Sequence, residues 1–115
     1  MVETVEMTKA DWVDVTWDDA RGAAAASIAF GSGEAHVRLL RLDAGGEIGA
    51  HETGSGQLFV PLEVGGWVRE GEREAAVAVG SAVYLPRGVT HAKGSESGLL
   101  ALVVQVTDLE LGGEV

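Results

Sequence analysis

The chain has 115 residues, 46% of them hydrophobic, which fits one domain with a single core and excludes a disordered protein. Eight Lys and Arg residues stand against 18 Asp and Glu residues, so the formal net charge is −10. This charge repels nucleic-acid phosphates and anionic lipid headgroups, and the basic residues are scattered singly among acidic ones. We therefore expect neither a nucleic acid nor a membrane as a partner.

The sequence contains no cysteine, which excludes disulfides, thiolate metal sites and cysteine nucleophiles. The first nine residues lack the basic start and the apolar run of a signal peptide. No apolar stretch approaches the roughly 20 residues that span a bilayer. These features predict a cytoplasmic protein.

Seventeen glycines and two prolines divide the chain into segments of strand length, and none of these has a convincing helical period. The alternating and β-branched apolar residues predict strands at residues 23–30, 36–42, 57–64, 67–69, 75–79, 82–85 and 99–107. Many short strands separated by turns indicate an all-β sandwich or barrel. We expect a single domain over residues 1–115, with residues 1–22 as an N-terminal arm and residues 111–115 as a frayed tail.

Two of the predicted strands carry apolar residues on both faces, at residues 57–64 and at residues 99–106. A small barrel has only one interior, so the second apolar face requires another cover. A second copy of the chain is the simplest cover, and we expect a homodimer.

The segment that starts at Gly80 has a fixed spacing: five residues follow this glycine, then Pro86, one residue, Gly88, two residues and His91. Gly80 favours a turn, residues 82–85 favour a strand, and the proline and second glycine bend the chain so that a histidine begins the next strand. At every position this spacing resembles the second motif of the cupin superfamily.

The first cupin motif is matched in part upstream. Gly45 and His51 have the right spacing, whereas Thr53 stands in place of the motif's second histidine and Gln57 in place of its glutamate. The resemblance extends over residues 37–106. It implies an all-β, cupin-type jelly-roll barrel, also called a double-stranded β-helix, with a pocket inside.

In cupins that bind a metal, the motif side chains converge on one divalent ion. The resemblance therefore implies His51, Gln57 and His91 as metal ligands. This set contains no carboxylate, so we expect weak affinity and an ion that favours imidazole, such as Zn, Ni, Fe or Cu. The alternative is a pocket without a metal, in which the two histidines bond to each other, to Gln57 or to water. Both alternatives stay open.

Further polar and aromatic side chains are candidates for lining a ligand pocket. These candidates are Thr53, Phe59, Arg38, Tyr84 and Gln105. Each also has an interpretation as a packing residue, and solvent is the favoured surroundings for Arg38 and for His36 on the same strand face. Packing is also the expectation for the three tryptophans. The sequence identifies no catalytic residue.

We interpret the chain as a cupin that binds a small molecule in its barrel and carries a weak or degenerate divalent-metal site. One alternative is a metal-dependent enzyme of the oxygenase, isomerase or lyase type, in which the ion acts on a small substrate. Another alternative is a non-catalytic dimeric interaction module. The cupin fold alone does not choose among them, because one fold supports many functions.

Overall fold

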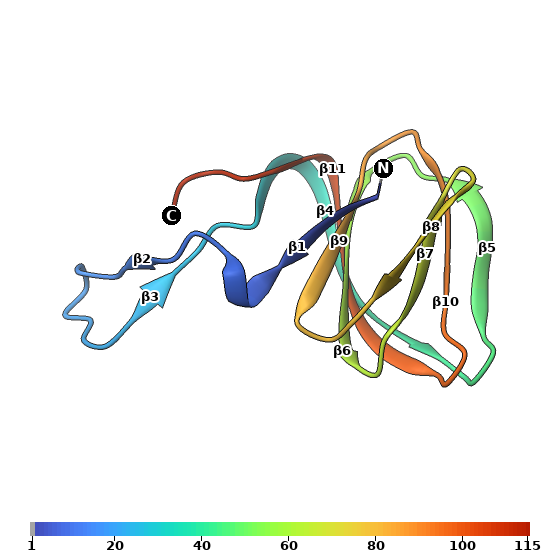
Figure 1. The fold of residues 1–115 in the computed structure, drawn as a ribbon. Helices are drawn as coiled ribbons and strands as arrows, with labels where there is room; N and C mark the ends of the chain where they lie inside the picture. The colour runs from blue at the N-terminus through green and yellow to red at the C-terminus, as the bar shows by residue number, and fades with distance from the viewer. Residues whose placement is uncertain (1) are drawn as a thin grey trace.

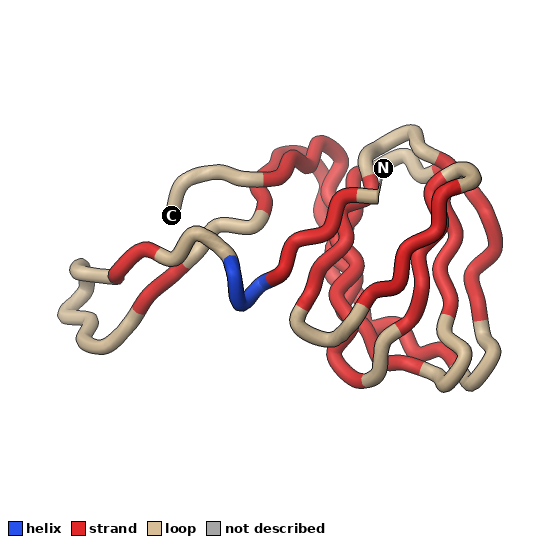
Figure 2. Tube along the Cα trace, viewed as in Figure 1, coloured by secondary structure: helices blue, strands red, loops and turns tan. Residues whose placement is uncertain are grey.

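The computed structural model describes residues 2–115, and strands make up most of it. Two antiparallel sheets face each other across the core, and a small hairpin projects from them (Figures 1 and 2). The first sheet has the order β1 (Glu3–Glu6), β9 (Ser81–Leu85), β6 (Gly56–Glu63), β11 (Leu99–Leu111) and β4 (Ala29–Leu42). The second has the order β5 (Glu47–Glu52), β10 (Thr90–Gly94), β7 (Gly66–Glu70) and β8 (Arg73–Val77). The hairpin pairs β2 (Val13–Asp14) with β3 (Ala24–Ala25), and the one short 3-10 helix of the described chain, η1 (Met7–Lys9), follows β1.

From β4 onward the chain crosses between the two sheets at almost every connection. Among the strands from β4 to β11, only β7 and β8, which are joined by a tight turn at Gly71, are neighbours both in the sequence and in one sheet. Strands that alternate between two facing sheets in this way form a jelly-roll barrel. The predicted all-β fold class is therefore confirmed.

The core lies between the inner faces of the two sheets. On β6 the inward residues Gln57, Phe59 and Pro61 are buried, and on β11 Ala101 and Val103 are buried. The buried hydrophobic cluster also contains Leu42, Val68, Val77, Val83, Leu85 and Leu99. Successive side chains of a strand point to opposite faces, so one alternate set of apolar residues in each strand builds the core.

The opposite face of the first sheet is apolar as well. Leu102 and Val104 of β11 lie beside Leu39 and Val37 of β4, and these two β4 side chains are 69% and 65% exposed. We call these four side chains the outer apolar face. The second apolar side of β11 is therefore part of an apolar surface that a single copy of the chain leaves exposed to solvent.

The predicted strand at residues 23–30 is wrong as one element. Residues 24 and 25 pair only with β2, residues 26–28 leave the ladder, and β4 begins at Ala29. Gly31 lies within β4 and not in a turn. A glycine is needed there because the backbone carbonyl of Asp108 on β11 lies too close to leave room for a Cβ. The sequence pattern also missed β1, whose residues 3–6 pair with β9 inside the barrel sheet.

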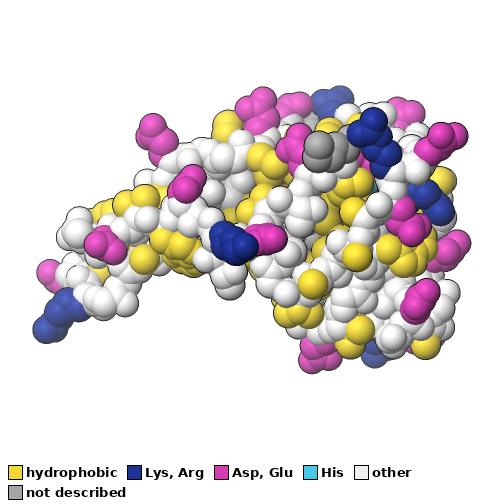
Figure 3. All heavy atoms as spheres, viewed as in Figure 1, with side chains coloured by type: hydrophobic (Ala, Val, Ile, Leu, Met, Phe, Trp, Pro, Cys, Tyr) yellow, Lys and Arg dark blue, Asp and Glu magenta, His cyan; other side chains and the backbone are white. Residues whose placement is uncertain are grey.

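The β2–β3 hairpin projects away from the barrel and makes the molecule long, at 46 Å against 29 and 24 Å in the other directions (Figure 1). Trp12 and Trp17 belong to this segment and are 56% and 47% exposed. Figure 3 shows hydrophobic side chains along it. The expectation that these two tryptophans pack is thus not met within one copy of the chain.

The C-terminal end runs back along this projecting segment. The N–H of Gly112 donates to the carbonyl of Ile28 at 2.9 Å, and the Ser27 hydroxyl donates to the carbonyl of Gly112 at 2.7 Å. The first residues of the expected tail are therefore held by hydrogen bonds. Over residues 2–115, the structure has no helix that is long and apolar enough to cross a membrane.

Candidate ligand site between the sheets

The two motif histidines meet because β5 and β10 pair as antiparallel neighbours. His51 and His91 are direct cross-strand partners in this ladder. Their rings lie edge to face, with centroids 4.7 Å apart and planes at 80°. Side chains on directly opposite residues of an antiparallel pair are in contact range. The spacing of the two motifs thus places both imidazoles at one point of the barrel.

His91 is completely buried, and neither of its ring nitrogens has a hydrogen-bond partner among the described residues. The pKa of this imidazole is lowered to about 4, mainly by burial and to a smaller extent by the nearby Lys93 and His51. His91 is therefore neutral at pH 7, with one N–H donor and one acceptor nitrogen that both lack a partner.

His51 has a fixed orientation although it is exposed. Its Nδ1 lies 2.8 Å from the carbonyl oxygen of Gly49. Because a carbonyl oxygen only accepts, Nδ1 carries a proton and donates it to this bond. His51 lines a cavity between the sheets, and Nε2 is the ring nitrogen that this bond does not use.

Lys93 belongs to the site although neither sequence motif predicts it. It follows His91 by two positions on β10 and so shares its inward face, and it is only 3% exposed. Its ammonium donates to Oε1 of the buried Gln57 and lies 5.4 Å from the ring centre of Phe59. Burial lowers the pKa of Lys93 to about 8, which leaves the side chain mostly cationic at pH 7.

A cavity of about 150 Å³ is lined by several of these groups, although His91 is not among them. Polar residues that line it are His51, Gln57, Lys93, Arg38 and Gln105, and Ile48 and Val103 contribute apolar walls. Arg38 is exposed, and its guanidinium donates to Oε1 of Gln105 across β4 and β11. Two of the predicted pocket residues, Arg38 and Gln105, therefore lie at the cavity together with the two predicted ligands His51 and Gln57.

Three other candidates lie elsewhere. The Thr53 hydroxyl donates to the carbonyl of Ser55 and accepts the N–H of the same residue at 3.1 Å, which fixes the turn before β6. Tyr84 donates its hydroxyl to the carbonyl of Leu109. Phe59 is fully buried beneath Lys93 and belongs to the core. His36 pairs with Glu34 at 2.6 Å and is 48% exposed, close to the expected solvent position.

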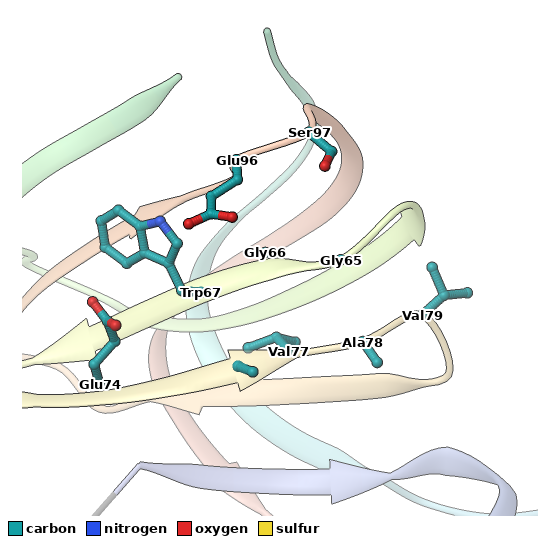
Figure 4. Close-up of a pocket in the computed structure, with 10 residues that line it drawn as sticks. Gly65, Gly66, Trp67, Glu74, Val77, Ala78, Val79, Glu96 and Ser97 are labelled. Atoms are coloured by element: carbon teal, nitrogen blue, oxygen red, sulfur yellow. The ribbon is translucent and has the colours of Figure 1, made fainter. Parts of the chain in front are cut away.

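A larger hollow of about 560 Å³ lies elsewhere, on β7 and β8 (Figure 4). The figure shows Trp67, Glu74 and Glu96 around it. None of the motif histidines lines it. We place the functional site in the smaller cavity, because the buried polar groups gather there.

The predicted metal ligands offer a donor set that suits a divalent cation poorly. Gln57 already directs its amide oxygen to Lys93, whose ammonium would repel a cation beside it. Among residues 2–115, no group of three or more His, Asp or Glu residues is arranged to hold a metal. The two imidazoles are nitrogen donors of the right type, but they have no anionic partner. A metal at His51, Gln57 and His91 stays a prediction.

Solved structures share this architecture. The crystal structure of TT1209 from Thermus thermophilus is similar with 35% identity and a TM-score of 0.60, over 70% of this chain and 81% of that one. A cupin superfamily protein from Desulfitobacterium hafniense is similar with 12% identity and a TM-score of 0.62, over 70% and 77% of the two chains. No protein-family model and no curated protein matches the sequence.

Salicylate 1,2-dioxygenase from Pseudoaminobacter salicylatoxidans has the same fold over 70% of this chain, with 16% identity and a TM-score of 0.60. This chain corresponds to only 25% of the length of the dioxygenase. The rolled sheets and the interior site between them define a small jelly-roll barrel protein. With the two motifs and these structural relatives, the chain belongs to the cupin superfamily.

Proposed function

We propose that this cupin binds a small organic molecule in the cavity between the two sheets, beside His51, Gln57 and Lys93. The site is concave, has apolar walls and contains a few convergent polar groups, which is the usual character of a small-molecule site. Its size suits a molecule much smaller than a typical cofactor.

The observation that carries this proposal is the buried polar cluster itself. Among residues 2–115, both ring nitrogens of the buried His91 lack a partner, and the buried ammonium of Lys93, which lines the cavity, donates only to the neutral Gln57. Leaving one buried polar group unsatisfied costs about 1–3 kcal/mol, so apolar residues of similar size would stabilise the fold better. Buried polar groups that do not serve stability are typical of binding sites.

A screen by NMR tests the proposal. We expect that some members of a library of small polar fragments shift the backbone amide signals of His51, Gln57 and Lys93 in the ¹⁵N-labelled protein. Gln105→Trp, which places a bulky ring at the cavity, should abolish these shifts. Glu110→Trp, an exposed position on the same strand, should leave them unchanged. If no fragment shifts the cavity signals, or if Gln105→Trp leaves the shifts intact, the proposal fails.

The weak metal site is a second, separable part of the expected function. The adjacent His51 and His91 rings favour it, whereas Lys93 and the missing carboxylate oppose it. We expect elemental analysis of untagged protein to find well below one Zn, Ni, Fe or Cu per chain. A stoichiometric metal would show that the site rearranges around the ion and would favour the metal-dependent enzyme.

The homodimer is supported by the outer apolar face. Val37 and Leu39 are the most exposed large hydrophobic side chains among residues 2–115, and they lie beside two further apolar residues of β11. A contiguous apolar surface of this kind is typical of an interface between chains. The occupant that we propose is the same face of a second copy, because a two-fold axis brings identical patches together.

A further inference from the structure

The charges at the cavity are opposite in sign to those of the whole protein. The chain carries 18 acidic residues and eight basic ones. Yet Arg38 and Lys93 both line the cavity, and no Asp or Glu lines it in the described part of the chain. A cavity with two cationic side chains and no carboxylate, inside an acidic protein, is a local site of positive potential.

Lys93 is the more deeply buried of these two cationic side chains. An ammonium group has three N–H donors, and the structure gives Lys93 one acceptor, Oε1 of Gln57. Within residues 2–115, no carboxylate forms a salt bridge with it. A buried charge is normally paired, so an anionic partner that enters the cavity would complete the environment of this ammonium.

The neighbouring groups favour the same kind of partner. Because the amide oxygen of Gln57 accepts from Lys93, its amide nitrogen is left as a donor, and among residues 2–115 that nitrogen has no hydrogen-bond partner. Arg38 uses one nitrogen for Gln105 and keeps further N–H donors at the cavity. Donors from three side chains suit the oxygens of an anion and repel a cation.

We propose that the ligand is a short-chain carboxylate, an inference that rests on the proposed small-molecule function. Its carboxylate group binds the Lys93 ammonium, and its apolar chain lies against Ile48 and Val103. The volume of about 150 Å³ equals that of about five water molecules at roughly 30 Å³ each. This space fits a carboxylic acid of a few carbons.

Calorimetric titration at pH 7 tests this inference with acetate, propionate and butyrate, each compared with its neutral amide. We expect at least one carboxylate to bind ten-fold or more tightly than its amide. Lys93→Met removes the charge but keeps a side chain of similar length, and it should abolish the preference. Lys9→Met is the matched control, because Lys9 lies on the surface beside Glu6, and this variant should keep the preference.

A measurement on the unmodified protein covers the case in which Lys93→Met does not fold. We expect the preferred carboxylate to shift the side-chain ¹³Cε signal of Lys93, and the matching amide to leave it unchanged. Equal binding of acid and amide, an unchanged Lys93 signal, or retention of the preference in folded Lys93→Met would overturn the inference. If neutral fragments bind in the cavity while no carboxylate is preferred, only the ligand class is wrong. If nothing binds there, the proposed function fails as well.

Discussion

Two buried bases, His91 and Lys93, link the stability of this protein to pH. Both have a folded-state pKa below the ordinary value, because burial disfavours the charged form. Across the neighbouring strands His91 is opposite His51 on β5 and Glu70 on β7, and Lys93 follows on its own strand. For each base, the unfolded chain binds the proton more readily than the folded chain does.

Acid should therefore destabilise the fold through His91. The pKa is about 4 in the folded protein and 6.5 in the unfolded chain, so this contribution is full above pH 6.5 and is lost as the pH falls toward 4. We expect the free energy of unfolding, measured with urea, to fall by about 2 kcal/mol between pH 7 and pH 5. His91→Gln should lose clearly less over the same range. Equal losses in both proteins would show that His91 is not the responsible group.

Lys93 should also limit the metal affinity that is gained when the missing ligands of the first motif are restored by mutation. Thr53→His with Gln57→Glu restores the ligand types of the motif, but the new carboxylate would pair with the Lys93 ammonium that now contacts Gln57. We expect this double variant to gain little affinity for Zn, Ni or Mn in calorimetry. Adding Lys93→Met should raise the affinity at least ten-fold, which corresponds to about 1.4 kcal/mol.

The control for this repair is His51→Ala in the triple variant, which should remove the gain because one of the two adjacent imidazoles is lost. If the triple variant binds metal no more tightly than the original protein, residues 51, 53, 57 and 91 do not converge on one ion. The predicted ligand set would then be wrong.

At the scale of elements, the loop between β9 and β10 depends on one glycine. Gly88 has a φ of +83°, a conformation that side chains disfavour, and its N–H donates to the carbonyl of Thr53 at 3.0 Å. This bond ties the loop to the end of β5, whose His51 partners His91. The second motif therefore holds the two histidine-bearing strands together as well as supplying a histidine.

Gly88→Ala should lower the free energy of unfolding by about 1 kcal/mol or more, measured by urea denaturation, because the strain comes from the backbone and not from a clash. Gly54→Ala is the matched control. Gly54 is equally open to an added Cβ and does not have the left-handed φ, so this variant should be nearly neutral. The interpretation of the loop fails if both variants are equally stable.

The sequence predicted the elements whose pattern is strong and local. The inward residues of β6 and β11 alternate over several positions, and the second motif locates β9 and His91 by fixed spacing. The predicted strand at residues 36–42 is shorter than β4, because glycines such as Gly31 and Gly33 are typical of turns. In the structure they allow close contact with β11 at Asp108 and Thr107, a constraint that depends on distant pairing.

Within the candidate site, the two motifs predicted His51 and Gln57 but not Lys93. Lys93 lies outside both motifs, and the available signal was its position two residues after His91, between the small residues Ala92 and Gly94. Its contact with Gln57 joins residues that are 36 positions apart, and no local pattern encodes that contact. Thr53 stands at the position of the first motif's second histidine and is a pocket candidate for that reason, whereas its hydroxyl is used in the turn to Ser55.

At the scale of the whole molecule, the outer apolar face should control assembly. Light scattering at micromolar concentration should give a mass of about 24 kDa, twice the 11.9 kDa of the chain. Leu39→Glu should give the monomer mass, because a charge would be buried against a second apolar face. Val79→Glu, at an exposed valine after β8, should remain a dimer. A monomeric unmodified protein would exclude this assembly.

A crystal structure of the protein grown with butyrate would show directly whether the cavity beside Lys93 holds an anionic ligand. We expect electron density for butyrate between the two sheets, with a carboxylate oxygen within hydrogen-bond distance of Lys93 Nζ and the carbon chain against Ile48 and Val103. A cavity that contains only water at saturating butyrate, or a Lys93 ammonium paired with a carboxylate of the protein itself, would contradict it.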